Sequence, residues 1–135
     1  MRWVWPLAAR AAWDLADTAT TAGLLALLDR HQPGELAPMQ RAERDLARAR
    51  LTATGPGADA AFAAAITGLR QHSTPYHLAH GLLDHAQHLL RGHQDGAAEA
   101  ATAEARGIAD RLRCPPVLDR ADTIQPTTPR AAASR

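Results

Sequence analysis

Apolar residues recur every three or four positions along most of this chain, which is the spacing of amphipathic helices rather than strands. Between residues 58 and 71, for example, Ala58, Phe62, Ala65, Ile66 and Leu69 fall on one face. Proline, glycine and aspartate residues interrupt these runs at intervals. The pattern predicts six helices and a shorter seventh, over residues 6–16, 19–31, 38–53, 58–71, 75–91, 96–113 and 116–123. The first six pair into hairpins over about residues 3–31, 38–71 and 75–113.

The third hairpin has the clearest helix boundaries. Thr74 is suited to be the N-cap and Pro75 the first helical residue, because proline lacks only an N–H that would be unpaired there. The segment 92–96 then breaks the pattern, and Asp95 within it is placed to cap the next helix. A pair of prolines starting at Pro115 ends that helix.

Composition supports an all-α fold in a single domain. Alanine accounts for 32 of the 135 residues and leucine for 17, whereas valine and isoleucine together number only 5. Such a composition favours helix and leaves little from which to build a sheet. The periodic part covers residues 1–124. Residues 125–135 contain turn formers and no apolar period, so we expect them to be a disordered tail.

Charge and hydropathy exclude several classes of partner. The 15 basic residues, all arginine, nearly balance 14 acidic ones, and a net charge of +1 lacks the basic density typical of nucleic-acid binding. No apolar run approaches the roughly 18 to 20 residues that span a bilayer. The apolar run 3–9 is short for a signal peptide and contains Pro6, and the single Cys114 provides no disulfide framework. We therefore expect a cytoplasmic protein with no direct nucleic-acid or membrane partner.

The second and third hairpins repeat each other at a spacing of about 40 residues. In their second helices a small, large, small triplet at 58, 62 and 65 recurs, with a weaker middle residue, at 98, 102 and 105. In their first helices Leu46 and Ala47 correspond to His85 and Ala86 at a spacing of 39. Small residues at fixed offsets let two antiparallel helices approach closely, and each hairpin can bury its remaining apolar face against the next.

These triplets resemble the second-helix signature of tetratricopeptide (TPR) repeats, in a long variant of about 40 residues. The first-helix signature of that family is mostly missing. With the runs TPYHLAHGLLDHAQHLL, DGAAEAATAEARGIADRLRC and PPVLDRAD, residues 3–124 resemble the C-terminal TPR region of large actinobacterial signalling ATPases. In those proteins a nucleotide-cyclase or LuxR-type DNA-binding domain accompanies an NTPase and a long TPR array.

The resemblance implies a short right-handed solenoid of stacked antiparallel hairpins that serves as a sensor or interaction surface. It implies no catalysis, because the chain has neither a GxxxxGK[ST] phosphate loop nor a cyclase carboxylate constellation. In TPR arrays the first helices line a groove. If Ala47 and Ala86 are the small residues of those helices, the candidate groove residues are Trp13, Arg41, Arg44, Arg48, His80 and Gln87.

Such a mildly basic groove suits an acidic or carboxylate-terminated peptide. The alternative is a solvated charged face on which Arg41 and Arg48 pair with Asp45. A second candidate surface is the N-terminal helix, whose tryptophans at 3, 5 and 13 could mediate packing or self-association.

Histidines gather on the helix predicted over 75–91. At 100° per residue, His77, Asp84 and His88 fall within about 40° of one another and His80 about 60° to one side, so a metal site is geometrically possible. The leucines of this helix lie on the opposite side. We therefore interpret the His/Asp stripe as a solvent-facing surface and predict no metal, cofactor or catalytic residue.

Three functions remain open at this point. The first is a non-enzymatic protein-interaction module, the C-terminal TPR-like part of a signalling or transcriptional regulator. The second is an accessory part of a nucleotide-dependent ATPase or cyclase regulator whose catalytic domains lie on another segment. The third is a histidine-rich metal-binding protein. We predict the first.

Overall fold

The computed structural model describes residues 4–126, and within this range it contains seven α-helices and no strand, which confirms the all-α prediction. The helices are α1 (Val4–Asp14), α2 (Thr18–Asp29), α3 (Pro38–Leu51), α4 (Ala58–His72), α5 (Pro75–Arg91), α6 (Asp95–Leu112) and α7 (Pro115–Thr123). Most boundaries agree with the predicted ranges to within two residues. Residues 127–135 of the predicted tail lie outside the described residues, as does Trp3.

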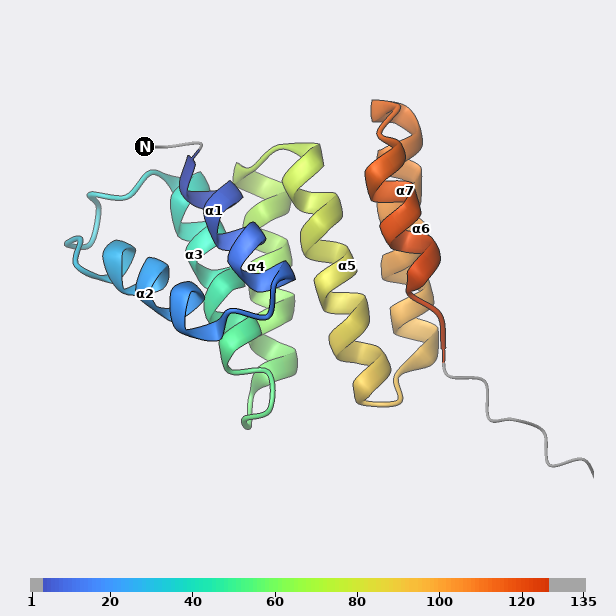
Figure 1. Ribbon diagram of the computed structural model, residues 1–135, viewed down its shortest axis with the longest axis horizontal. Coiled ribbons are helices and arrows are strands. Elements are labelled where there is room, and N and C mark those ends of the chain that lie inside the picture. The colour runs from blue at the N-terminus through green and yellow to red at the C-terminus, as the bar shows by residue number, and fades with distance from the viewer. Residues whose placement is uncertain (1–3, 127–135) are drawn as a thin grey trace, which may run out of the picture.

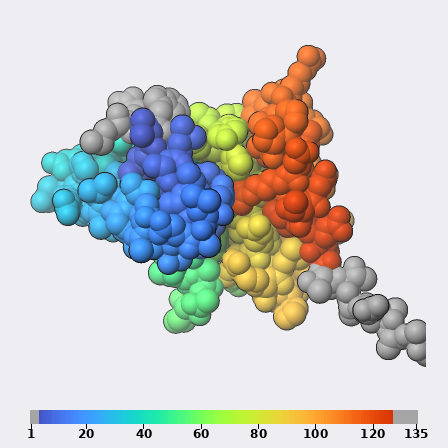
Figure 2. Space-filling view, viewed as in Figure 1, coloured from blue at the N-terminus to red at the C-terminus, as the bar shows by residue number. Residues whose placement is uncertain are grey.

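Each helix packs against the next one along the chain, so that the array extends from α1 and α2 at one end to α6 and α7 at the other (Figure 1). Alternate helices also touch, α1 with α3 and α5 with α7. In the space-filling view the N-terminal hairpin and α7 approach each other over α5 (Figure 2). The odd-numbered helices therefore share one side of the molecule, and the site described below lies among them.

Four of the predicted helix starts differ from the structure by one or two residues, and the reasons are clear for α6 and α1. Thr74 caps α5 as expected, accepting a hydrogen bond from the backbone N–H of His77. Asp95, predicted as the cap of α6, is instead the first helical residue, and Gln94 precedes it. An acidic residue in the first turn still interacts favourably with the helix dipole. Helix α1 begins at Val4 rather than Pro6, because a proline in the first turn removes no intrahelical hydrogen bond.

One contiguous apolar core runs through α3 to α7. Its largest fully buried side chains are Phe62, Leu46, Leu69, Leu83 and Val117. Both small-large-small triplets predicted from the repeat are buried, at positions 58, 62, 65, 98, 102 and 105. The repeat therefore marks the faces where α4 and α6 pack against their neighbours.

Helices α4 and α5 approach each other closely at Gly81 of α5. A Cβ atom there would lie 2.5 Å from Leu69 Cδ1 and 3.3 Å from Ile66 Cδ1. Only a glycine lets α5 pack this closely on α4 without displacing those side chains.

The N-terminal hairpin combines a few buried apolar residues with polar contacts. Trp5 Nε1 donates a hydrogen bond to the Leu24 carbonyl over 2.8 Å, which ties α1 to α2. Asp17 caps α2 by accepting from the Thr20 amide over 2.9 Å. Only Thr21 and Leu28 of α2 are buried, so this helix contributes little apolar area.

Candidate functional site

A single buried carboxylate binds three arginines at the centre of the odd-numbered helices. Asp84 of α5 is only 3% exposed. Arg10 of α1 meets it side-on, with Nη1 2.8 Å from Oδ1 and Nη2 2.9 Å from Oδ2. Arg50 of α3 donates from Nε to Oδ2 over 2.8 Å and also from Nη2. Arg120 of α7 donates from Nη2 to Oδ1 over 2.5 Å. We call these four residues the Asp84 cluster.

The Asp84 cluster links four helices that are far apart in the sequence. Each arginine lies on a different odd-numbered helix, and the guanidiniums reach Asp84 of α5 from α1, α3 and α7. Bidentate pairing of guanidinium with carboxylate fixes orientation as well as distance. The cluster therefore sets the relative positions of α1, α3, α5 and α7.

The charges of the cluster do not balance. Burial alone would raise the pKa of Asp84, but the charges of Arg10, Arg50 and Arg120 hold it well below its usual range. Burial lowers the pKa of Arg50, whereas for Arg10 the attraction of Asp84 outweighs burial and raises it. Two further carboxylates compensate the other two guanidiniums: Asp14 lies 3.9 Å from Arg10, and Glu43 is near enough to favour the charged forms of Arg10 and Arg50.

His80 borders the cluster in its neutral form. Arg120 Nη1 lies 3.0 Å from His80 Nδ1 and 3.2 Å from the His80 carbonyl oxygen. Burial, together with the charges of Arg10 and Arg120, lowers the pKa of His80 to about 3. The neutral ring can therefore accept a hydrogen bond from Arg120, and it remains neutral throughout the physiological range.

A second polar group lies beside the cluster and contains residue types found in hydrolase triads. Ser73 Oγ donates to Glu43 Oε1 over 3.1 Å, and His77 Nδ1 lies 3.6 Å from the same oxygen. In a nucleophilic triad the serine would instead be hydrogen-bonded to the histidine. Because the serine and the histidine both face the Glu43 carboxylate rather than each other, this arrangement does not activate Ser73 as a nucleophile.

The prediction that the His/Asp stripe faces solvent is wrong. Asp84 and His88 are buried, and His77 is largely so. Arg10 and Arg120 cover Asp84 from flanking helices, while His88 stacks on Phe62 at 4.6 Å between ring centroids and pairs with Asp59 at 2.5 Å. The helical wheel identified a polar face correctly, but α1, α3 and α7 bring complementary groups that bury it.

The six candidate groove residues lie in two places. Trp13, His80 and Gln87 are half-buried on α1 and α5, where the Arg50 guanidinium lies 5.8 Å from the centroid of Trp13. Arg41, Arg44 and Arg48 lie on α3, about 120° to 180° around the helix from Arg50.

The three arginines on α3 have different partners. Arg48 pairs with Asp29 at 2.5 Å and with Asp45 at 3.7 Å, and Arg44 contacts Asp45 at 3.3 Å. The ion pairs of the described residues include none for Arg41. A cleft of about 240 Å³ brings Arg41 and Arg44 together beside the α2–α3 connection, and no acidic residue lines it. We call it the Arg41 cleft.

Sequence reasoning missed the three arginines of the Asp84 cluster. Arg10 stands within the run AARAA, and Arg50 directly follows buried Ala49. An arginine among small apolar residues was the available signal, since such a side chain on a core-facing surface needs a buried partner. The identity of that partner could not be read from the sequence, because Asp84 is 74 residues from Arg10.

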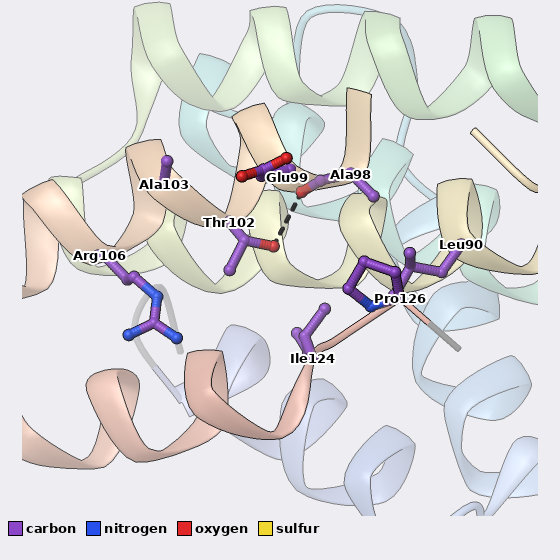
Figure 3. Close-up of a pocket in the computed structure, with 8 residues that line it drawn as sticks. All are labelled: Leu90, Ala98, Glu99, Thr102, Ala103, Arg106, Ile124 and Pro126. Atoms are coloured by element: carbon purple, nitrogen blue, oxygen red, sulfur yellow. Dashed lines mark hydrogen bonds between the residues drawn. The ribbon is translucent and has the colours of Figure 1, made fainter. Parts of the chain in front are cut away.

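Two further clefts differ in their chemistry. One, of about 410 Å³, lies where α6 meets the end of α7 (Figure 3) and is lined by Leu90, Ala98, Glu99, Thr102, Ala103, Arg106, Ile124 and Pro126. Its Thr102 hydroxyl donates to the Ala98 carbonyl over 2.8 Å, and Arg106 pairs with Asp122 at 2.5 Å. This cleft is therefore mainly an apolar surface on which Thr102 and Arg106 already have partners.

The other cleft, of about 390 Å³, adjoins the Asp84 cluster. Its lining is formed by Trp13, Arg50, Ala53, Thr54, His88, Arg91 and Gly92. We call it the Trp13 cleft. It combines an aromatic wall with cationic side chains and has no acidic residue in its lining.

Searches for similar proteins give no guide to these sites: no family model matches the chain, and neither a curated protein nor a solved structure matches it. Within residues 4–126, no three histidine, cysteine, aspartate or glutamate side chains gather closely enough to hold a metal ion. Over the same residues, no helix combines the length and hydrophobicity needed to cross a bilayer.

Proposed function

We propose that this chain is a non-enzymatic protein-interaction module built as a TPR-like array of helical hairpins, and that it serves a signalling or transcriptional regulator. Sequential antiparallel pairing, contacts between alternate helices and two matching buried triplets support this architecture. The Asp84 carboxylate fixes the odd-numbered helices relative to one another before any partner binds. Binding to such a preorganised surface loses less conformational entropy.

The chemistry of the buried groups supports a binding role over a catalytic one. A general acid or base works best with a pKa near the operating pH. The pKa values of Asp84 and His80 are both lowered away from that range, and Ser73 is not paired with a base. These groups stabilise and orient helices instead.

The Arg41 cleft is the observation that carries the proposed partner chemistry. It holds two of the arginines predicted from the sequence as groove residues, with no acidic side chain in the lining. Arginine recognises carboxylates through paired N–H donors. We therefore propose an acidic peptide segment of a partner protein as the ligand.

Fluorescence anisotropy with labelled ten-residue peptides tests this function. We expect a peptide of alternating Glu and Ala to bind and its Gln counterpart not to bind, with affinity falling as salt rises. Arg41→Gln combined with Arg44→Gln should weaken binding, while Arg111→Gln, an exposed arginine on α6, should not. Equal binding of both peptides, or binding of neither, would overturn the proposal.

Self-association through the N-terminal helix forms a separate part of the proposal. Val4, Leu7 and Leu15 are exposed on or just after α1, and Leu27 on α2 adds to this surface. Thermal unfolding followed by circular dichroism at two protein concentrations about fiftyfold apart tests it, since an oligomer melts at a higher temperature when concentrated. Identical midpoints would show that these residues do not mediate pairing.

A further inference from the structure

In the Trp13 cleft, the guanidinium of Arg50 lies beside the Trp13 ring and has one nitrogen that makes no hydrogen bond to Asp84. Arg50 donates to Asp84 through Nε and Nη2, and none of the hydrogen bonds of the described residues uses its Nη1. No fully enclosed side-chain nitrogen or oxygen among the described residues lacks a partner, so the small exposed part of this side chain, 4% of its surface, includes Nη1. The Asp84 cluster thus holds Arg50 rigidly while leaving one donor for another acceptor.

A second cation faces the same cleft. Arg91, in the last turn of α5, is exposed, and the ion pairs of residues 4–126 include none for it. His88, also in the lining, is already paired with Asp59. An anion entering here would meet two arginines and no acidic side chain of the lining.

The rest of the lining is suited to a flat apolar body. Trp13, Ala53 and Gly92 contribute carbon surface, and Thr54 adds one hydroxyl. The volume of about 390 Å³ falls within the range of small-molecule sites, which typically combine apolar walls with a few convergent polar groups. A single inorganic anion would leave most of that volume and the indole ring without contacts.

We propose that the Trp13 cleft binds a small aromatic carboxylic acid, with its carboxylate shared by Arg50 Nη1 and Arg91 and its ring against Trp13. Planar guanidinium groups match a carboxylate geometrically, and an aromatic wall favours an aromatic ligand. Because the cleft adjoins Arg50 of the Asp84 cluster, an occupant would contact the group that orients α3 against α5. This inference goes beyond the peptide-binding function and does not rest on it.

Isothermal titration calorimetry of the full chain with benzoate and indole-3-acetate tests the inference. We expect both acids to bind at one site, and benzamide, which has the same shape without the charge, to bind at least about tenfold more weakly. Arg91→Gln should lower the affinity for benzoate by a similar factor. Because Arg91 is exposed, its replacement should leave the melting temperature unchanged.

Arg111→Gln is the matched control, since Arg111 is also an exposed arginine in the last turn of its helix and lies outside the cleft. Three results would overturn the inference: benzamide binding as well as benzoate, equal affinity in the Arg91 and Arg111 variants, or no detectable binding of either acid. Inorganic phosphate competing as effectively as benzoate would also overturn it, by showing a general anion site. Peptide binding at the Arg41 cleft is measured separately, so either proposal can fail alone.

Discussion

The two ends of this molecule are stabilised by different forces. The contiguous apolar core draws its residues from α3 to α7, and none of its members in residues 4–126 comes from α1 or α2. The N-terminal hairpin instead meets the rest through Arg10 on Asp84, Asp29 on Arg48 and the Trp13 ring under Arg50. One region is held by a contiguous apolar core, and the other combines ion pairs with the burial of a few separate apolar residues, among them Ala9 and Ala12.

The difference shows what each kind of contact provides. Apolar burial contributes free energy in proportion to area and tolerates several packings. A buried ion pair contributes less net stability, because desolvation offsets attraction, but it is strongly destabilising when one partner is removed. The core should therefore set the overall stability of the fold, and the Asp84 cluster should set where α1 and α7 sit.

Removing the shared carboxylate should give the largest effect. Asp84→Asn leaves three arginines without their counter-charge, and we expect a loss of about 3–5 kcal/mol in the free energy of unfolding. Hydrogen exchange should accelerate first in α1, because α7 is also held by Val117 and Ala121, which are buried in the apolar core. Asp110→Asn, an exposed residue on α6, is the control and should change stability by less than about 0.5 kcal/mol. Uniform loss of protection across all helices would contradict a docking role.

Matched leucine truncations compare the two regions directly. Leu83 in the core is fully buried, and Leu83→Ala should cost about 2–5 kcal/mol. Leu27 on α2 is 48% exposed, so Leu27→Ala should cost less than about 1 kcal/mol. Urea denaturation midpoints measure both changes. Similar costs at the two positions would show that α2 belongs to the same core.

Two glycines sharpen the comparison at the level of single methyl groups. Gly81→Ala forces a Cβ atom against Leu69 and Ile66, and we expect a loss of about 1–3 kcal/mol. At Gly23 of α2 an added Cβ atom would meet nothing within 4 Å, so Gly23→Ala should gain roughly 0.5–1 kcal/mol from helix propensity. Thermal melts of both variants give the sign of each change. A gain at Gly81 would show that the core around it is loosely packed.

Acidification should produce the smallest effect. The unfolded chain protonates His80 near pH 6.5, whereas the folded protein keeps it neutral down to about pH 3. Its contribution to stability is therefore present above pH 6.5 and is lost as the pH falls toward 3. Between pH 7 and 5.5 we expect a loss of about 1 kcal/mol at most.

Melting temperatures of the parent and His80→Gln across this pH range measure that loss. The melting temperature of the variant should depend less on pH. Some dependence should remain, because burial also lowers the pKa of His85. An unchanged slope in the variant would indicate that His80 is not protected from protonation in the folded protein.

Much of the fold followed from local physical chemistry. The 3.6-residue period, the proline and glycine interruptions and the alanine-rich composition determine where helices begin and end and that strands are absent. Thr74 followed by Pro75 marks a helix start, because the Thr74 hydroxyl accepts a hydrogen bond from a free N–H of the first turn and Pro75 has no N–H to satisfy. The buried triplets were equally visible, because they repeat within one chain.

The candidate sites depended on contacts that no local pattern specifies. The wheel of α5 identified the polar stripe with Asp84 but not the arginines that cover it, which are contributed by α1, α3 and α7. Periodicity determines which residues share a face of one helix, whereas the partner of that face depends on how distant helices pack. The sequence by itself determined the helices and their buried stripes. Only the tertiary structure decided that the polar face of α5 became a buried charge cluster, because burying Asp84 requires counter-charges from residues as many as 74 positions away.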